Sequence, residues 1–525
     1  MGLNSMSRLS IAGFWIALNL SAQPAPVKVS GSVVNSSGGA LRGVRLSLVG
    51  ADPSHFEPPA AVTETRADGT FVFETVRPGR YLLEKLKVGF VSGYFGDEQG
   101  RDAIVLQVRP GAEIANLRVS MEALAEAASV SGRVTDTNGV PIPRLSVQLL
   151  KDDFSPEGEQ RRSLVNGASA STDTEGLFRL GGIPAGTYYL SAKPITPYMQ
   201  PVTSETWIGA YYGGTSQIED ARRISISAGE NVQGLDLQLV RTPLVPVEGR
   251  LLGARSVTTL RINALNGDIS SWQGSAKTAD DGSFRLMTPP GSYILSAFEE
   301  VSGKIVIAVP PGGITGVSVP VQPVRPLSGR VSTEDARIAG ISFSLQSAPP
   351  GATKKNSGIL DSANTFSIPG VGAWTYSLIP NDFPDGWYME SARLGSRDVL
   401  ENGVDGASLS GKESLVVTVK RADNELAGTV FSNSQEPLAG ATVTMIPDSP
   451  RPRQLYLYQR VSTDPKGRFV FENLAPGAYR IHAWQSLPRF AERNEEFIGP
   501  YRARGTRVEV VNGRKQDVRL KVTPR

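Results

Sequence analysis

The segment Ser462–Trp484, STDPKGRFVFENLAPGAYRIHAW, contains a turn with a glycine, a short alternating apolar run, a Pro-Gly turn and a second alternating run. Related phrases occur at 66–86 (RADGTFVFETVRPGRYLLEKL), 171–193 (STDTEGLFRLGGIPAGTYYLSAK), 278–298 (TADDGSFRLMTPPGSYILSAF) and 361–380 (DSANTFSIPGVGAWTYSLIP). Alternation of this kind is typical of strands with one buried and one solvated face. The repeat therefore predicts five turn–strand–turn–strand units.

The five phrases keep aromatic residues and glycines at nearly constant spacing. A glycine stands two residues before the first phenylalanine in every copy except the fourth, where Ala363-Asn364 replaces the Asp-Gly turn. Glycine at such turns permits positive φ angles, and an adjacent proline fixes the preceding turn residue. We therefore expect the repeated aromatic residues to be core residues, namely Phe71, Phe178, Phe284, Phe366 and Phe469, and Tyr81, Tyr188, Tyr293, Tyr376 and Tyr479.

Two further elements accompany each phrase. A run such as VSGRVTDTNGVPIPRLSVQLL (130–150) precedes it, with a glycine at 31, 132, 249, 329 or 428, and two alternating runs such as RVEVVNGRKQDVRLKV (507–522) close the unit. Each unit thus holds about seven strands, which is typical of a two-sheet sandwich. The sequence predicts an all-β chain of five tandem antiparallel Greek-key β-sandwiches, with domains at 27–122, 128–241, 245–323, 325–421 and 424–523.

The N-terminus resembles a secretory signal. Arg8 precedes an apolar run from Leu9 to Leu20, and Ser21-Ala22 supply small residues for cleavage. We expect residues 1–22 to be a signal peptide that is removed on export to the periplasm, the cell surface or the medium. No later run approaches the 18 or so apolar residues of a membrane-spanning helix.

The repeat resembles the carboxypeptidase regulatory-like domain. The resemblance lies in the order of its residues, G-x-V … G-x-x-V-x-L … D-G-x-F-x-F-x-x-L-x-P-G-x-Y-x-L. That small sandwich is similar to transthyretin, to the B-type repeat of collagen adhesins and to starch-binding-like domains. The resemblance covers nearly all of the chain after the signal, and is strongest in the first, second and fifth units. It implies a β-sandwich fold and a surface location, and it leaves the ligand open.

Composition argues against several classes of function. The 525-residue chain has 54 Lys plus Arg and 51 Asp plus Glu, so its net charge of +3 predicts no nucleic-acid binding. It has no cysteine, which removes disulfides and thiol nucleophiles, and only two histidines, His55 and His482, which are far apart for a zinc site or a catalytic triad. We expect no catalytic residues, no metal and no cofactor, although paired carboxylates of a glycosidase type stay open.

Two other site interpretations are weaker. Asp152-Asp153 and Asp280-Asp281 could suggest calcium, but the second pair belongs to the repeated turn and the first lacks further spaced oxygen ligands. A Lys–Asn crosslink of the adhesin type would need a recurring lysine, and only Lys28 lies in a first strand. Neither pattern predicts a site.

Aromatic residues outside the strand alternation are the best ligand candidates. They cluster after the second strand of the phrase, and flat aromatic faces on a rigid sandwich can bind sugar rings. The same residues could instead pack over a sheet or between sandwiches, and the sequence favours packing. The predicted glycan contacts are Trp207, Tyr211, Tyr212, Trp484 and Tyr501.

The sequence therefore favours a secreted, non-catalytic structural or binding protein of the bacterial cell envelope, with a carbohydrate or another envelope component as candidate partner. One alternative is an accessory or scaffold partner of a secreted enzyme that degrades polysaccharides or peptides. A second alternative is an enzyme with an unrecognised carboxylate site.

Overall fold

The computed structural model describes residues 27–50, 59–96, 103–109, 111, 113–123, 127–194, 204–254, 256–265, 271–334, 341–347, 356–381, 386–464 and 466–523. The predicted signal peptide and His55 lie outside these residues. Strands dominate the described chain, and its α-helices are α1 (Val399–Asn402) and α2 (Glu495–Arg502). Among the described residues, no helix has the length and apolar character needed to cross a membrane.

The strands of the first three units follow one another along the chain. The first unit has β1 (Val27–Asn35), β2 (Arg45–Gly50), β3 (Ala61–Glu64), β4 (Thr70–Val76), β5 (Gly79–Leu86), β6 (Gly93–Tyr94), β7 (Val105–Val108) and β8 (Ile114–Met121). The second has β9 (Ala128–Asp136), β10 (Leu145–Phe154), β11 (Gln160–Ser171), β12 (Leu177–Ile183), β13 (Gly186–Pro194), β14 (Glu205–Ile208), β15 (Ala210–Tyr211), η2 (Ile218–Asp220), β16 (Ile224–Ile226), β17 (Asn231–Val232) and β18 (Leu237–Pro243). The third has β19 (Val245–Leu252), β20 (Thr259–Ala264), β21 (Gln273–Lys277), β22 (Ser283–Thr288), β23 (Gly291–Phe298), β24 (Val301–Val309), β25 (Ile314–Pro320) and β26 (Gln322–Pro323).

The last two units contain both α-helices. The fourth has β27 (Arg325–Ser332), β28 (Ser342–Ser347), β29 (Asn356–Ile359), β30 (Thr365–Val371), β31 (Thr375–Asn381), β32 (Trp387–Leu394), β33 (Arg397–Asp398), α1, β34 (Val404–Asp405), η3 (Gly406–Ser408) and β35 (Ser414–Arg421). The fifth has β36 (Glu425–Phe431), β37 (Thr442–Pro447), η4 (Leu455–Leu457), β38 (Gln459–Ser462), β39 (Arg468–Glu472), β40 (Gly477–Trp484), η5 (Ala491–Arg493), α2, β41 (Thr506–Val510) and β42 (Lys515–Lys521).

Each unit packs two sheets against each other. In the fifth, the sheet β39-β36-β42 faces the sheet β38-β37-β40-β41, and the other units repeat this plan with added edge strands. The buried apolar residues form a separate large cluster between the sheets of each unit. Phe469 and Tyr479 both belong to the fifth cluster and are each 3% exposed. The all-β sandwich fold is confirmed; the domain limits stay predictions.

One feature of the sheets differs from the purely antiparallel expectation. The first and last strands of each unit pair in parallel, as β1 with β8, β9 with β17 and β18, β19 with β25, β27 with β35, and β36 with β42. The fifth unit shows how this arises: its seven strands reverse direction at each turn, so the last strand runs the same way as the first. The other units add edge strands and keep this parallel pair.

The repeated glycine of the first strand lies where the last strand approaches most closely. A Cβ atom on Gly132 would lie 2.3 Å from the carbonyl oxygen of Leu235, and one on Gly428 would lie 2.4 Å from that of Val518. The corresponding positions 31, 249 and 329 are equally crowded by a carbonyl oxygen or by the ring of the repeated phenylalanine. Only glycine leaves room for this packing.

The turn before the phrase is held by the residues that repeat there. The Thr463 hydroxyl, which is buried, donates to the Leu438 carbonyl (2.6 Å) and accepts from the Ala441 amide (2.9 Å). Asp464 Oδ1 accepts from the amides of Lys466 and Arg468, both at 2.8 Å. In the fourth unit, Asn364 takes the positive φ angle (58°) that glycine supplies elsewhere, which asparagine tolerates better than most residues.

The repeated tyrosine closes the second turn with its hydroxyl group. In four units the hydroxyl donates to the carbonyl four residues earlier, as from Tyr188 to Pro184 (2.7 Å) and from Tyr479 to Ala475 (2.8 Å). In the fourth unit, the Tyr376 hydroxyl accepts from the Gly372 amide at 2.9 Å. This contact explains why tyrosine and not phenylalanine recurs here.

Gly132→Ala should destabilise the second sandwich by about 1–3 kcal/mol, because the new methyl group must displace the Leu235 carbonyl. The matched control is Gly181→Ala on the neighbouring strand β12, where a Cβ atom meets nothing within 4 Å. Hydrogen exchange of peptides from this sandwich in the mature chain measures both effects. Equal protection in the two variants would contradict the close approach as the reason for the glycine.

Tyr188→Phe should cost about 1 kcal/mol at neutral pH, because the Pro184 carbonyl loses its partner. Burial also raises the pKa of Tyr188 to about 12. The protonated hydroxyl of the wild type therefore contributes its full share to the free energy of unfolding below the ordinary tyrosine pKa of about 10, and this contribution is lost as the pH rises toward 12. Urea unfolding followed by circular dichroism at pH 8 to 12 checks both points. A variant with unchanged stability and an unchanged alkaline slope would refute them.

Candidate functional site

The predicted ligand residues of the second sandwich lie on its rim, where two of them contact arginines. Trp207, on β14, packs against the core of this sandwich, and the Arg241 guanidinium lies 4.7 Å from its ring centroid. Tyr212 is also partly buried, with Arg222 at 5.7 Å from its ring. Tyr211 is only 3% exposed and packs in a small separate cluster with Leu150. Tyr211 thus presents almost no ring surface to solvent.

The two predicted residues of the fifth sandwich contact each other. The rings of Trp484 and Tyr501 meet edge to face at 5.2 Å, and Trp484 Nε1 donates to Thr444 Oγ1 at 3.0 Å. Trp484 is 1% exposed. Its position matches the packing alternative, and the indole has no free face for a sugar ring.

The burial of Trp484 has a clear cause. On β40, Tyr479, Ile481 and Ala483 face the sandwich core, so His482 and Trp484 belong to the opposite face. The sequence predicted that this face is wet, but His482 and Trp484 are each 1% exposed. The segment 485–505, which contains η5 and α2, covers them; we call it the insert. The expectation of a wet outer face is therefore wrong at this position.

A buried ion pair anchors the insert to the sheet. Arg460 Nη2 lies 3.1 Å from Glu492 Oε2, and the two side chains are 10% and 3% exposed. The same nitrogen donates to the carbonyls of Leu487 (3.1 Å) and Pro488 (2.7 Å). Buried charges with this many partners tolerate the loss of either one poorly.

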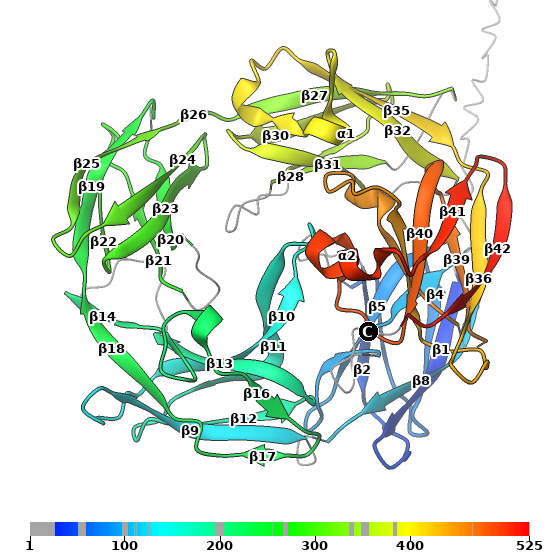
Figure 1. Ribbon diagram of the computed structural model, residues 1–525, viewed down its shortest axis with the longest axis horizontal. Helices are drawn as coiled ribbons and strands as arrows, with labels where there is room; N and C mark the ends of the chain where they lie inside the picture. Colours follow the sequence, from blue (N-terminus) through cyan, green and yellow to red (C-terminus); the bar gives the residue numbers. More distant parts are fainter. Residues whose placement is uncertain are drawn as a thin grey trace, which may run out of the picture.

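The insert also binds the second sandwich. The hairpin between β10 and β11 places Phe154 edge to face against Phe497 of α2, with ring centroids 5.5 Å apart. Asn494 Nδ2 donates to the Gly158 carbonyl at 2.8 Å, and Arg493 donates to the Pro156 carbonyl. Figure 1 shows α2 on the inner side of the ring of sandwiches, beside β10 and β11.

The contact between the insert and the second sandwich requires glycine at position 158. Gly158 has a φ angle of +87°, and a Cβ atom there would lie 2.6 Å from the carbonyl carbon and oxygen of Arg493. We call the contact between residues 154–159 and the insert the junction. Sequence reasoning missed Phe154, Gly158 and Arg493, because only the length of the two loops signals the contact.

The fifth sandwich touches two further neighbours. Arg80 Nη2 of the first sandwich donates to the Arg460 carbonyl at 3.1 Å, and Tyr456 packs against the cores of both the fourth and the fifth sandwiches. Figure 1 accordingly shows the sandwiches following one another around a ring, with the last beside the first.

The acidic pairs considered for calcium binding form ion pairs with arginines. Asp152 lies 3.3 Å from both Arg162 and Arg223, and Asp281 lies 2.7 Å from Arg250. Within the described ranges, no group of three or more His, Cys, Asp or Glu side chains could hold a metal ion.

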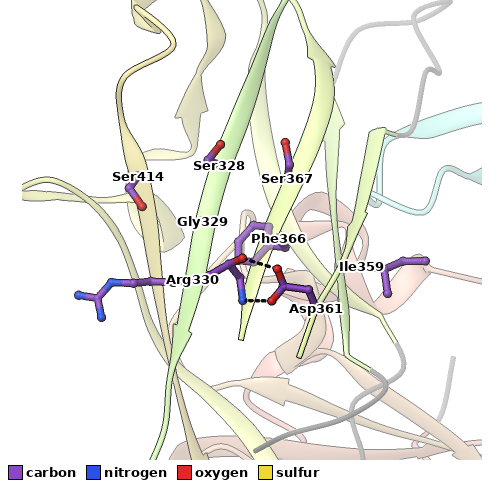
Figure 2. Close-up of a pocket in the computed structure, with 9 residues that line it drawn as sticks. Ser328, Gly329, Arg330, Ile359, Asp361, Phe366, Ser367 and Ser414 are labelled. Atoms are coloured by element: carbon purple, nitrogen blue, oxygen red, sulfur yellow. Dashed lines mark hydrogen bonds between the residues drawn. The ribbon is translucent and has the colours of Figure 1, made fainter. Parts of the chain in front are cut away.

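A shallow pocket of about 420 Å³ opens on the outer face of the fourth sandwich. Figure 2 shows Ser328, Ser367 and Ser414 on three neighbouring strands, with Asp361 and Arg330 at one end. The Thr365 amide and hydroxyl donate to the Asp361 carboxylate (2.8 and 2.6 Å), and these hydrogen bonds lower the pKa of Asp361. The carboxylate therefore serves the repeated turn, and the pocket contains none of the predicted ligand residues.

Two regions of the chain, 129–209 and 425–523, match the family model of the carboxypeptidase regulatory-like domain. These regions lie in the second and fifth sandwiches, the two that meet at the junction, and are similar to that domain. The other sandwiches share with them the first-strand glycine and the tyrosine hydrogen bond in the second turn. A comparison with curated proteins finds no match.

Several solved structures align with this chain at low sequence identity. The Bacillus anthracis TIE protein aligns at 13% identity and a TM-score of 0.16, over 57% of this chain and 51% of that one, so the chain spans about half of its length. The streptococcal ancillary pilin aligns at 12% (TM-score 0.21; 57% and 99%), and two B repeat units of the Staphylococcus aureus collagen binding protein align at 10% (TM-score 0.14; 75% and 100%). Likeness at this level gives no basis for transferring pilus assembly or collagen binding to this chain.

Trp207→Ala separates the two interpretations of the rim aromatics. Because Trp207 packs on the core and under Arg241, we expect a lower melting temperature and a loss of about 2–4 kcal/mol. Titration of the mature protein with polysaccharides tests the glycan prediction in parallel. A variant with unchanged stability and weakened glycan binding would reverse our interpretation.

Proposed function

We propose that the protein is a secreted, non-catalytic scaffold of the bacterial cell envelope, whose five sandwiches act as one preassembled unit. The observation that carries this proposal is the junction. There, two loops that lie more than 300 residues apart in the sequence bind each other through two side chain to carbonyl hydrogen bonds and an aromatic pair.

The positions of the contacts support a scaffold. A flexible string would join its sandwiches through linkers alone, whereas here the fifth sandwich contacts the first, the second and the fourth. The insert, a long loop that could have carried a ligand site, serves the junction instead: Phe497, Arg493 and Asn494 contact the second sandwich.

Within this proposal, a cell-envelope glycan is the ligand class to test first. Trp207 and Tyr212 are its proposed contacts, since both rings are only partly buried. Tyr501 lies at the edge of the insert, whereas Tyr211 and Trp484 would act through packing. An accessory role beside a degrading enzyme predicts co-purification with that enzyme, and a carboxylate-site enzyme predicts hydrolysis of the bound glycan.

Small-angle X-ray scattering of the mature protein tests the scaffold. We expect a compact particle, because the ring brings the fifth sandwich back to the first and second. Gly158→Ala should enlarge its maximum dimension, because the methyl group collides with the Arg493 backbone. Gly139→Ala is the matched control: it has a similar φ angle (+78°) in the same sandwich, with nothing within 4 Å of the new Cβ atom.

A wild-type particle with the length of five sandwiches end to end would overturn the scaffold. Export is tested separately by fractionating cells that produce the chain with and without residues 1–22. The full chain should appear in the envelope or the medium and the shortened chain in the cytoplasm.

A further inference from the structure

His482 occupies an unusual position for an ionisable side chain. It is 1% exposed on the outer face of the sheet, and within the described residues neither of its ring nitrogens has a hydrogen-bond partner. A Cβ atom on Gly505 would lie 2.5 Å from His482 Nε2, so the end of the insert is packed directly on the imidazole edge. Water can reach this ring only if the insert moves.

A continuous series of rings leads from His482 to the second sandwich. The imidazole stacks on Trp484 at 5.4 Å, and Trp484 contacts Tyr501 at 5.2 Å. Tyr501 lies 6.0 Å from Phe497, which contacts Phe154 at 5.5 Å. Movement of the insert away from His482 therefore also disturbs the junction.

The charged groups around His482 disfavour a positive charge on its imidazole. Arg480 precedes it on the same face of β40, and Arg502 at the end of α2 donates to the carbonyls of Pro447 (2.8 Å) and Asp448 (3.2 Å). The Asp448 carboxylate is already shared by Arg480 (2.6 Å) and Arg507 (3.1 Å).

Two carboxylates of the insert and the strands beside β40 offer His482 no counter-ion. Glu492 pairs with Arg460 of β38 at 3.1 Å, and Glu495, at the start of α2, pairs with Arg502 at 2.6 Å. The strand β37 contributes Thr444 beside His482, and its hydroxyl accepts from the Trp484 indole.

We propose that His482 makes the junction acid-sensitive: protonation of its imidazole lifts the insert from the sheet and separates the fifth sandwich from the second. A positively charged imidazole needs water or a carboxylate as a hydrogen-bond partner, and neither is present while the insert covers His482. Opening of the insert gives the imidazole access to water. The inference rests on the junction but not on secretion or on any ligand.

The direction of the effect follows from linkage. Burial, with a further contribution from Arg502 and Arg480, lowers the pKa of His482 to about 4. An imidazole exposed by opening titrates near 6.5. The open form therefore binds the proton more tightly than the closed form. The equilibrium constant for closure of the insert is at its full value above pH 6.5 and falls as the pH drops toward 4, by up to roughly 300-fold.

The absence of cysteine makes a distance measurement straightforward. Glu159→Cys and Glu496→Cys place two labels on exposed positions on either side of the junction in the full mature chain. We expect a short label distance at pH 7.5 and a longer, broader distribution at pH 4.5, with a midpoint between pH 4 and 6.5. Circular dichroism at both pH values verifies that the sandwiches stay folded.

His482→Gln should abolish the pH response, whereas the control His55→Gln should retain it. If His482→Gln does not fold, Phe497→Ala provides a second test: it should lengthen the label distance already at pH 7.5, because it breaks the ring series at α2. An equal pH response in His482→Gln, or an unchanged distance at pH 4.5, would overturn the proposal. If the labels are far apart in the wild type at pH 7.5, the junction itself and the scaffold fail instead.

Discussion

The close approach of the first and last strands constrains every sandwich of this protein. The last strand places a carbonyl oxygen where the first strand would carry a side chain, and in the fourth unit the ring of Phe366 on β30 crowds the same position, so only glycine fits there. The parallel pair then closes one sheet, and the other strands follow from chain reversal at short turns. Threonine, aspartate and tyrosine side chains bind the backbone of those turns, so the same few residue types recur in units whose surfaces differ.

The sandwich framework leaves its outer faces and long loops free to vary, and this chain uses them to bind its own sandwiches together. The insert of the fifth sandwich covers an outer sheet face and presents its far side to the β10–β11 hairpin. Burial of Trp484 and the contact between Phe154 and Phe497 are two ends of one packed layer. Stability of the insert and association of the two sandwiches are therefore coupled.

The framework could be predicted from the sequence because it depends on local, repeated signals. Alternation identified Phe469 and Tyr479 as core residues, and Asn364 was recognisable as a glycine replacement at a turn. The hydroxyl partner of Tyr479 was not predictable, because alternation reports which face is buried and not what a polar tip contacts. The parallel end strands needed the pairing of segments about 90 residues apart, such as Gly428 with Val518.

The candidate site was harder to predict. An aromatic residue outside the alternation can face solvent or another part of the chain, and Trp484 has the same sequence signature in both cases. The wet face expected for His482 is dry because the segment after β40 folds back over it, and nothing local to β40 encodes that cover. The joint between Phe154 and Phe497 depends on two loops that only their length distinguishes.

The parallel end strands also have a mechanical consequence. The chain enters each sandwich at the start of its first strand and leaves at the end of its last, at opposite ends of one hydrogen-bonded pair. Tension along the chain therefore loads that pair in shear, so its hydrogen bonds must break together and not one by one. Each sandwich therefore resists stretching through its two ends.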